Sequence, residues 1–551
     1  MKDIWEERLF AYCYALASIR ADPADHFTLA SRFAKSAIGR DIDQNTYNKL
    51  KKVLDLLNLP PWKISNGNPN ERFNVQPTLN NIHTDFVHPL SGIHSKIENR
   101  INLDSDIEKS IVSIVSRFKT SQSRFLAIWR LLPETFAKTY PDSAHLPSDW
   151  RLPDHTIWQQ AQINSGVCSA FTSASGPALF SFSFGPVQSF IEAARSVRDL
   201  WSGSTILSWL SFQAMIPVIE NYGPSSVIFP SLRGVPLVDL WLESHDILKN
   251  SHFKLNAQIC QISCLPNRFI AIVPFDESES LTQKCKESFQ DGWDSLTKYV
   301  HDHINHKCKK GWPNWDQYWG NQTTDFFDAH YAVLPYHDCN ETIGALLFSN
   351  NDNHLSSSRF HTICENWPSS GDHKSYYYFN KSWPVLIEMI SRLIETKRNL
   401  RNIPQGINAS DDGMIPQKCS LIGTQEQMGP GNFLESRKFW DAMYSETQDD
   451  RVRIREGERF GAIALTKRFA SPFLEREMGL SNSSPRFPDT ATIAAQEWLE
   501  KSDMDWKKLP RWSGQWLHQG NQILDDIPTD VKEKIRIAKS DQSLPPPIML
   551  F

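Results

Sequence analysis

The stretch FGPVQSFIEAARSVRDLWSGSTILSWL, residues 184–210, decides how the rest of the chain is interpreted. The apolar run at 178–184 predicts a buried strand, which ends at Gly185 and Pro186. From Val187 onward, apolar residues recur every three or four positions. This spacing predicts a long helix over residues 187–222, bent near Pro217. A strand that passes through a glycine turn into a helix is therefore the centre of the predicted fold.

The opposite face of that helix carries Glu192, Arg195 and Asp199, spaced three and four residues apart. Such spacing indicates ion pairs along a solvated surface. An alternative is that the Gly185 turn and the free N–H groups at the helix start bind an anion such as a phosphate. A single Gly-Pro turn is weak evidence for an anion site, so both interpretations stay open.

Composition and charge exclude several classes of protein. A chain of 551 residues, of which 40% are hydrophobic and 22% charged, is typical of a globular protein with roughly three to four domains. The net charge of −5 does not indicate a large basic surface that binds nucleic acid, although local basic patches remain compatible with it. There is no signal-peptide pattern, no apolar run of about 18 residues and no disulfide framework among nine scattered cysteines. We therefore expect a cytoplasmic protein that does not enter a membrane.

The order of the predicted elements indicates an α+β fold. Helical patterns cover much of the first 140 residues, at 6–20, 46–57 and 107–132. Strands are expected at 178–184, 226–229, 268–273 and 329–334. Beyond the helix at 187–222, further helices are expected at 280–306, 383–402 and 491–501. The resulting β-α-β-β-α-β succession is that of a ferredoxin-like fold, which hosts many functions and defines none of them.

Three groups of potential metal ligands occur, and none completes a site. The N-terminal group lacks the adjacent His-Asp pair of His-Asp phosphohydrolases; its members are Asp22, Asp25, His26, His83, Asp85 and His88. Adjacent His-Asp pairs occur only downstream, at 245–246, 301–302 and 337–338. In the group His301, His303, His306 and Cys308, only His303 and His306 share a helix face, whereas a closed zinc site needs four ligands. Cys419 has Ile422 where a zinc knuckle would have its second cysteine. We expect turn, cap and packing roles for all three groups, and no metal.

Eight stretches of the chain together resemble one protein family. They are FVHPLSG (86–92), FLAIWRLLPE (125–134), LPSDWRLPDHTIW (146–158), GPVQSFIEAARSVRDLWSGSTILSWL (185–210), VIFPSLRGVPLVDLW (227–241), LPNRFIAIVP (265–274), GERFGAIALTKRF (457–469) and FPDTATIAA (487–495). No single stretch is decisive, but the ordered set is specific. It resembles the large palm-containing subunit (Cas ten, Cmr type) of type III-B CRISPR RNA-guided effector complexes.

The resemblance implies four regions. They are a helical, degenerate HD-type domain at 1–145, a first ferredoxin-like palm at 146–345, a loop-rich insertion with a degenerate zinc ribbon at 346–456, and a helical linker toward a second palm at 457–551. The family's nuclease pair would fall at Ala21 and Asp22, and its Cys-x-x-Cys-Gly is Cys419-Ser-Leu-Ile422-Gly423, so both metal sites are expected to be lost.

The second palm of the family carries a Gly-Gly-Asp-Asp turn, whose aspartates hold the metals that convert ATP into cyclic oligoadenylate. No such turn occurs in this chain, because the Asp pairs at 411–412, 449–450 and 525–526 all lack the glycines. The resemblance therefore implies the N-terminal part of such a subunit, truncated before the second palm.

On this basis we expect a scaffold without its own catalysis, assembled with the other type III effector subunits, guide RNA and target RNA. An alternative is one half of a split cyclic-oligoadenylate synthase, which binds ATP with Mg²⁺ when a separately encoded second palm completes it. A third alternative is a nuclease that acts through Asp22 and His26. No catalytic or metal-binding residue is expected, and Arg195 and Asp199 are expected to be structural. The resemblance implies these nucleotide-binding candidates: Gly185, Pro186, Gln188, Ser202, Gly203 and Ser204.

Overall fold

The computed structural model describes most of the chain in separate segments. These are residues 3–17, 23–42, 44–57, 84–87, 94–97, 103–146, 148, 155–249, 260, 262–307, 312–336, 374–400, 417–448 and 452–479. Several predictions lie outside the described residues: those on Ala21 and Asp22, on His83 and His88, on Cys308, on the three Asp pairs and on the helix at 491–501.

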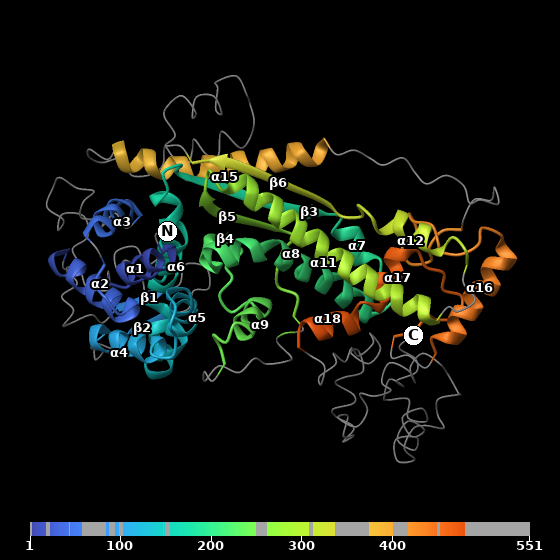
Figure 1. The fold of residues 1–551 in the computed structure, drawn as a ribbon, viewed down its shortest axis with the longest axis horizontal. Coiled ribbons are helices and arrows are strands. Elements are labelled where there is room, and N and C mark those ends of the chain that lie inside the picture. Colours follow the sequence, from blue (N-terminus) through green and yellow to red (C-terminus); the bar gives the residue numbers. More distant parts are fainter. Residues whose placement is uncertain are drawn as a thin grey trace, which may run out of the picture.

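A four-stranded antiparallel sheet forms the middle of the molecule (Figure 1). Its strands are β3 (Pro177–Gly185), β4 (Val227–Phe229), β5 (Arg268–Pro274) and β6 (Asp328–Pro335), in the spatial order β4-β5-β3-β6. Each lies where the sequence predicts a strand. Strand β5 lies between β3 and β4, and helices connect β3 to β4 and β5 to β6, as in a split β-α-β unit.

Helices cover both faces of the sheet. Side chains of β3 alternate between the faces, so that Phe182 and Phe184 contact Phe289 on one side. That side is covered by α8 (Val197–Tyr222) and α11 (Ser278–Lys307). On the other side, Leu179 packs with Leu386 of α15 (Lys374–Asn399). Helix α6 (Ile157–Thr172) covers the same face of the sheet over β5. Because β3 is buried on both faces, its sequence is a nearly continuous apolar run.

Two predicted helices are each divided in two. The predicted helix at 187–222 is a short α7 (Gln188–Glu192) followed, after a break at 193–196, by α8. Pro217 lies within α8, as predicted, and the bend expected there stays a prediction. After the break, the Ser196 hydroxyl caps α8 by accepting a hydrogen bond from the Asp199 N–H at 3.2 Å. The predicted helix at 107–132 is likewise α4 (Leu103–Val115) and α5 (Ser121–Thr139), the second capped by Thr120.

The N-terminal helices form one end of the molecule. They are α1 (Ile4–Ala17), α2 (Pro23–Ile38), α3 (Gln44–Leu57), α4 and α5, with the hairpin of β1 (Thr84–Val87) and β2 (His94–Ile97) and the 3₁₀-helix η2 (Pro141–His145). Helix α2 was not predicted. Helix α1 is buried over most of its length and packs against α6, the helix behind the sheet. Gly166 of α6 permits this layer to approach the 3₁₀-helix η3 (Pro224–Ser226), since a Cβ there would lie 1.9 Å from the Ser225 carbonyl oxygen.

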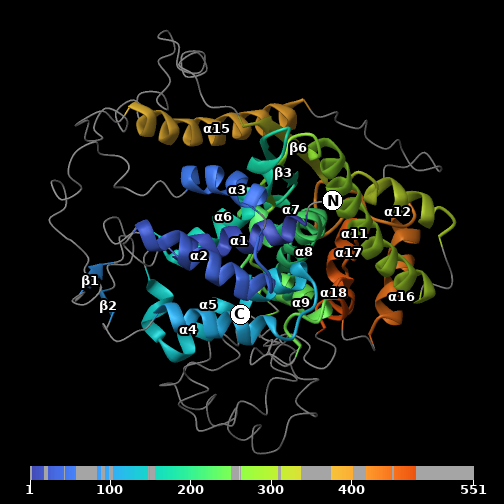
Figure 2. The same cartoon turned by 60° about the vertical axis from the view of Figure 1, so that its left-hand side comes forward.

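The C-terminal elements lie at the opposite end, as two views show (Figures 1 and 2). They are α16 (Phe433–Glu446), α17 (Ala462–Phe469) and α18 (Ser471–Glu477), next to α12 (Trp315–Thr323). Between the two ends, α9 (Pro236–Ser244) packs between α5 and α8. Helix α16 was not predicted. One continuous cluster of buried residues joins the N-terminal helices, the sheet and these elements. Among the described helices, none combines the length and apolarity needed to cross a bilayer.

Candidate functional site

The turn after β3 holds three of the predicted nucleotide-binding residues. Gly185 and Pro186, joined by a cis peptide bond, are half-buried, and Gly185 pairs in register with Asp328 at the end of the sheet. Gln188 is exposed, and its side-chain amide donates to Glu192 at 2.8 Å. The amide of Asn267 fixes the strand end by donating to the Phe184 carbonyl at 2.7 Å. The turn is therefore well anchored and partly open to solvent.

The other three candidates lie in the first turns of α8. Ser202 and Gly203 are buried and Ser204 is half-buried. A Cβ on Gly203 would lie 2.8 Å from Cε of Lys467, so α17 covers this part of α8. The structure thus separates the six candidates into an accessible turn and a largely covered group on α8. The long helix begins at Val197, where Ser196 caps its first N–H groups. An anion site formed by the Gly185 turn and the start of this helix would need those N–H groups next to Gly185, and they are not there.

Lys467 of α17 closes the break between α7 and α8. Its buried ammonium group donates to the carbonyl oxygens of Phe190 and Ala193, and to that of Ile191 at 3.0 Å. These carbonyls terminate α7, where a cation is a favourable partner. Burial lowers the pKa of Lys467 to about 8, against the attraction of Asp199. The lysine therefore holds a kinked backbone in place of a continuous helix.

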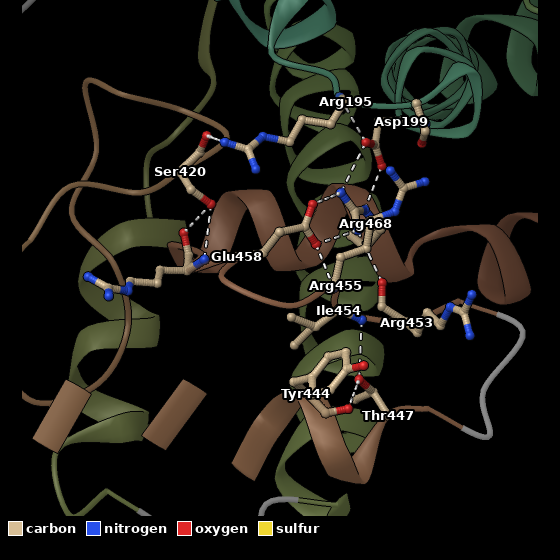
Figure 3. Close-up of polar contacts among 12 residues, drawn as sticks. Arg195, Asp199, Ser420, Tyr444, Thr447, Arg453, Ile454, Arg455, Glu458 and Arg468 are labelled. Atoms are coloured by element: carbon tan, nitrogen blue, oxygen red, sulfur yellow. Dashed lines mark hydrogen bonds and ion pairs between the residues drawn. The ribbon is translucent and has the colours of Figure 1, made fainter. Parts of the chain in front are cut away.

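Arg468, the next residue, forms a buried ion-pair network (Figure 3). Its guanidinium donates to both carboxylate oxygens of Asp199, at 2.7 and 3.1 Å, and to both of Glu458, at 2.9 and 3.1 Å. The last N–H donates to the Arg453 carbonyl at 3.1 Å, so all five donors of the side chain are satisfied. Burial lowers the pKa of Arg468, but the two carboxylates outweigh this effect and raise the pKa above its ordinary value.

The charges on α7 and α8 therefore do not form the solvated ion-pair row that the sequence predicts. Asp199 is fully buried, and it accepts from the Arg195 backbone N–H at 3.0 Å as well as from Arg468. The exposed Arg195 side chain instead donates to the Ser420 carbonyl at 2.9 Å (Figure 3). Both residues connect segments that are distant in sequence, as a structural role would require.

The segment at 417–426 forms a knuckle-like turn. The Ile422 N–H donates to Sγ of Cys419 at 3.3 Å, and the Gln425 and Cys419 backbones close the turn by hydrogen bonds of 2.9 Å. The donor set does not fit zinc, because Ile422 has no ligand atom at the position of a knuckle's second cysteine. Among the described residues, no three His, Cys, Asp or Glu side chains converge as a metal site would require.

The histidines at the end of α11 have separate neighbours. His301 contacts Asp316 of α12 at 2.8 Å and Asp302 at 3.2 Å, whereas the His303 ring lies 5.8 Å from the Phe469 ring at a tilt of 42°. His306 is exposed. His301 and His303 therefore connect α11 to α12 and α17.

Sequence reasoning missed Glu458, Lys467 and Arg468, although all three lie in the stretch GERFGAIALTKRF. A usable signal was present, since two adjacent cations follow a run of small and apolar residues that has the spacing of a buried helix. A buried cation in such a helix needs partners, and Asp199 has the complementary charge.

Comparison with known proteins identifies the central part of the chain. Residues 179–298, from β3 to most of α11, match the family model described as CRISPR-associated protein Cmr2, N-terminal. The CRISPR system Cmr subunit Cmr2 of Pyrococcus furiosus is 30% identical over 223 residues, which cover 36% of this chain and 24% of that protein. The CRISPR system CMR subunit Cmr2 of Saccharolobus solfataricus is 26% identical over 208 residues, which cover 31% of this chain and 19% of that protein.

Two solved structures share the fold over nearly the whole chain. The apo type III-B Cmr-beta cryo-EM structure matches with a TM-score of 0.55 and 18% identity, over 91% of this chain and 55% of that chain. The Cmr-beta structure bound to cognate target RNA matches with a TM-score of 0.53 and 17% identity, over 90% of this chain and 55% of that chain. The chain thus spans about half of these structures, and the sequence alignments cover about a quarter or less of the curated relatives. Over its central region, the chain is a homologue of Cmr2, the large subunit of type III-B CRISPR systems.

Proposed function

We propose that this chain is a large-subunit component of a type III-B CRISPR RNA-guided antiviral effector complex, in which it acts as a scaffold without catalysis of its own. The observation that carries the proposal is the Cmr2 match over β3 to α11, the part of the chain that forms most of the sheet and the helices on one face. By this homology, its partners in the cytoplasm are the other effector subunits, with guide RNA and target RNA bound through the complex.

In this proposal the four-stranded sheet with α8 and α11 is a ferredoxin-like first palm. Its strand order and its two connecting helices support the assignment. The helices before it correspond to a degenerate HD-type domain at 1–145, and the palm extends over 146–345. The insertion at 346–456 includes the knuckle at Cys419, and the segment from 457 is the linker toward a second palm.

The scaffold role is supported by the use of two buried carboxylates, Asp199 in the first turn of α8 and Glu458 before α17. Asp199 and Glu458 are both buried and both paired with Arg468, so neither is available to hold a metal ion for nucleotidyl transfer. Removing Arg468 from them would leave two uncompensated charges in the interior. These carboxylates stabilise the fold.

The accessible turn favours a second candidate function, nucleotide binding in a split cyclic-oligoadenylate synthase. Gly185, Pro186 and Gln188 lie at the sheet end, where a separately encoded second palm with ATP and Mg²⁺ could meet them. In this candidate the first palm only helps to hold the nucleotide.

Reconstitution by omission tests the proposal. The full chain is co-expressed with the remaining Cmr subunits and a guide RNA, with a purification tag on another subunit. We expect the chain to co-purify in fixed proportion, and the particle to fail to form when the chain is left out. Assembly of an equally complete, target-binding particle without the chain would contradict the proposal.

The second candidate is tested in the same particle. ATP and Mg²⁺ are added with and without the second-palm protein, and oligoadenylate is measured by chromatography. The split enzyme is supported if oligoadenylate appears only with the added protein. Its amount should then fall in the variant Gln188→Ala, but not in the control Ser189→Ala, which changes the neighbouring exposed residue. No product in any combination would leave only the scaffold.

A further inference from the structure

The first turn of α16 exposes two adjacent large apolar side chains. Phe433 is 55% and Leu434 65% exposed, while the buried face of the same helix carries Trp440 and Met443. Helix α16 lies at the end of the molecule away from the N-terminal helices and faces outward there (Figure 1). Adjacent exposed apolar side chains with a polar rim are a candidate surface for contact with another molecule.

An arginine stacks on the exposed aromatic ring. The guanidinium carbon of Arg459 lies 5.2 Å from the centroid of the Phe433 ring. Arg459 is held in this position, since its side chain donates to Gln417 and its backbone exchanges hydrogen bonds of 2.7 to 3.0 Å with Ser420. Arg195 reaches the same Ser420 from α7–α8, so two arginines converge on this loop. The stack is therefore a preformed flat surface with a positive charge.

Further basic side chains surround the stack. Arg437 and Lys438 follow Phe433 and Leu434 by four residues, so each lies on the same helix face one turn later. Lys418, next to the Gln417 that anchors Arg459, is exposed as well. Three acidic residues also lie here, namely Glu426, Glu435 and Asp441, the last at 3.8 Å from Arg437.

The local charge is positive in a chain whose net charge is −5. The N-terminal end of α16 adds the partial positive charge of its N–H groups, beyond the two that Asn432 caps. An aromatic ring with a stacked arginine, rimmed by lysine and arginine, is the combination that binds single-stranded nucleic acid, since bases stack on the ring and cations contact phosphates.

We propose that this surface, the Phe433 patch (Lys418, Phe433, Leu434, Arg437, Lys438 and Arg459), binds a single strand of nucleic acid. One base stacks on Phe433 and Arg459, and the other cations contact the flanking phosphates. The inference deepens the proposed function, because an RNA-guided complex supplies such a strand. The binding itself is a property of the isolated chain.

Fluorescence anisotropy tests the patch with the full chain and labelled oligouridylate or oligothymidylate of about 12 nucleotides. Phe433→Ala is expected to weaken binding by about tenfold, because base stacking is lost. Phe275→Ala, which removes an exposed phenylalanine after β5, serves as the matched control and should bind as wild type. Arg437→Glu with Lys438→Glu should reduce the dependence of affinity on salt, whereas Lys284→Glu with Lys286→Glu on exposed positions of α11 should not.

Equal binding of the two oligonucleotides supports recognition of single strands in general, and tighter binding of oligouridylate identifies RNA. The proposal is overturned if neither oligonucleotide binds, or if Phe433→Ala binds as tightly as wild type. An affinity unchanged in Phe433→Ala, together with loss of co-purification with other Cmr subunits, would assign the patch to a protein partner. Oligonucleotide binding is measured on the isolated chain, without the other subunits. A chain that does not bind the oligonucleotides contradicts the Phe433 patch, whereas a chain that does not assemble with the Cmr subunits contradicts the proposed function.

Discussion

The N-terminal helices and the C-terminal segment are both fixed to the sheet layers by a buried arginine, but the two arginines have opposite kinds of partner. Arg8 of α1 donates only to neutral groups, including the Ser165 carbonyl at 2.8 Å and the hydroxyls of Ser169 and Ser226 at 2.7 and 2.8 Å. Arg468 of α17 donates to two buried carboxylates.

This difference has an electrostatic consequence. Burial lowers the pKa of Arg8 to about 10 against weaker opposing attractions that include Glu7, whereas the hydrogen-bonded carboxylates raise the pKa of Arg468 above its ordinary value. In the N-terminal attachment, the buried charge of Arg8 is therefore stabilised by several neutral hydrogen-bond acceptors. In the C-terminal attachment, two buried carboxylates depend on Arg468 as their ion-pair partner, so it should be the more sensitive of the two to loss of its arginine.

The largest effect is expected for Arg468→Met. The local free energy of unfolding of α8 and α17 should fall by about 3–5 kcal/mol, since Asp199 and Glu458 lose their partner in the interior. Hydrogen exchange with mass spectrometry measures this loss by segment. The matched control Arg476→Met breaks an exposed ion pair with Glu477 and should cost at most about 1 kcal/mol. Equal losses in the two variants would contradict the account.

A second comparison substitutes one glycine at each end: Gly166 of α6, next to η3, and Gly203 of α8, next to Lys467 of α17. Gly166→Ala should destabilise α6 by about 3 kcal/mol, because its Cβ meets the Ser225 backbone carbonyl at 1.9 Å. Gly203→Ala should cost only about 1 kcal/mol, because its Cβ meets the movable Cε of Lys467. Exchange rates of α6 and α8 measure both effects, and a reversed order would show that the lysine is the more rigid neighbour.

Arg8→Met is expected to have a moderate effect. The protection of α1 and α6 should fall by about 2 kcal/mol, since several neutral acceptors lose a donor while an unpaired cation leaves the interior. The readout is again hydrogen exchange of these two helices. A loss as large as that of Arg468→Met would mean that the kind of partner makes no difference.

The last prediction concerns pH, and its effect is small over any single pH unit. Lys467 loses its proton near pH 8 in the folded chain and near 10.5 in the unfolded chain, so the unfolded chain binds more protons between these values. The stability contributed by this group should therefore rise with pH from about 8 to 10.5, by at most about 1.4 kcal/mol per pH unit. The free-energy difference between wild type and Lys467→Met, from the exchange of α7 and α8, should grow in that window. A difference that is flat in pH would contradict the lowered pKa.

The sheet could be predicted from sequence because its signals are local. Each of its strands is a short apolar run next to Gly, Pro or a polar turn, and β3 to β6 lie where these runs do. The break at 193–196 could not be predicted in this way. The apolar spacing continues through it, and the side chains that stabilise it, Lys467 and Arg468, lie in a distant part of the sequence.

The candidate site shows the same limit. The Gly185 turn is a local feature, and the structure has it at the end of the sheet, where the apolar run and the Gly-Pro pair predict the end of the strand. The burial of Ser202 and Gly203 depends on α17, which no local pattern around these residues reveals. Arg8 and Asp199 resemble surface charges of amphipathic helices in sequence, yet both are buried because a second layer covers them. Whether the six candidates bind a nucleotide stays a prediction.

Native mass spectrometry of the assembled Cmr particle tests the central claim most directly. The particle is isolated through a tag on another subunit after co-expression with guide RNA, and its mass is compared with and without this chain. The account predicts an intact particle whose mass includes this chain and guide RNA, and whose assembly is impaired by Arg468→Met but not by Arg476→Met. A complete particle from which this chain is absent would contradict it.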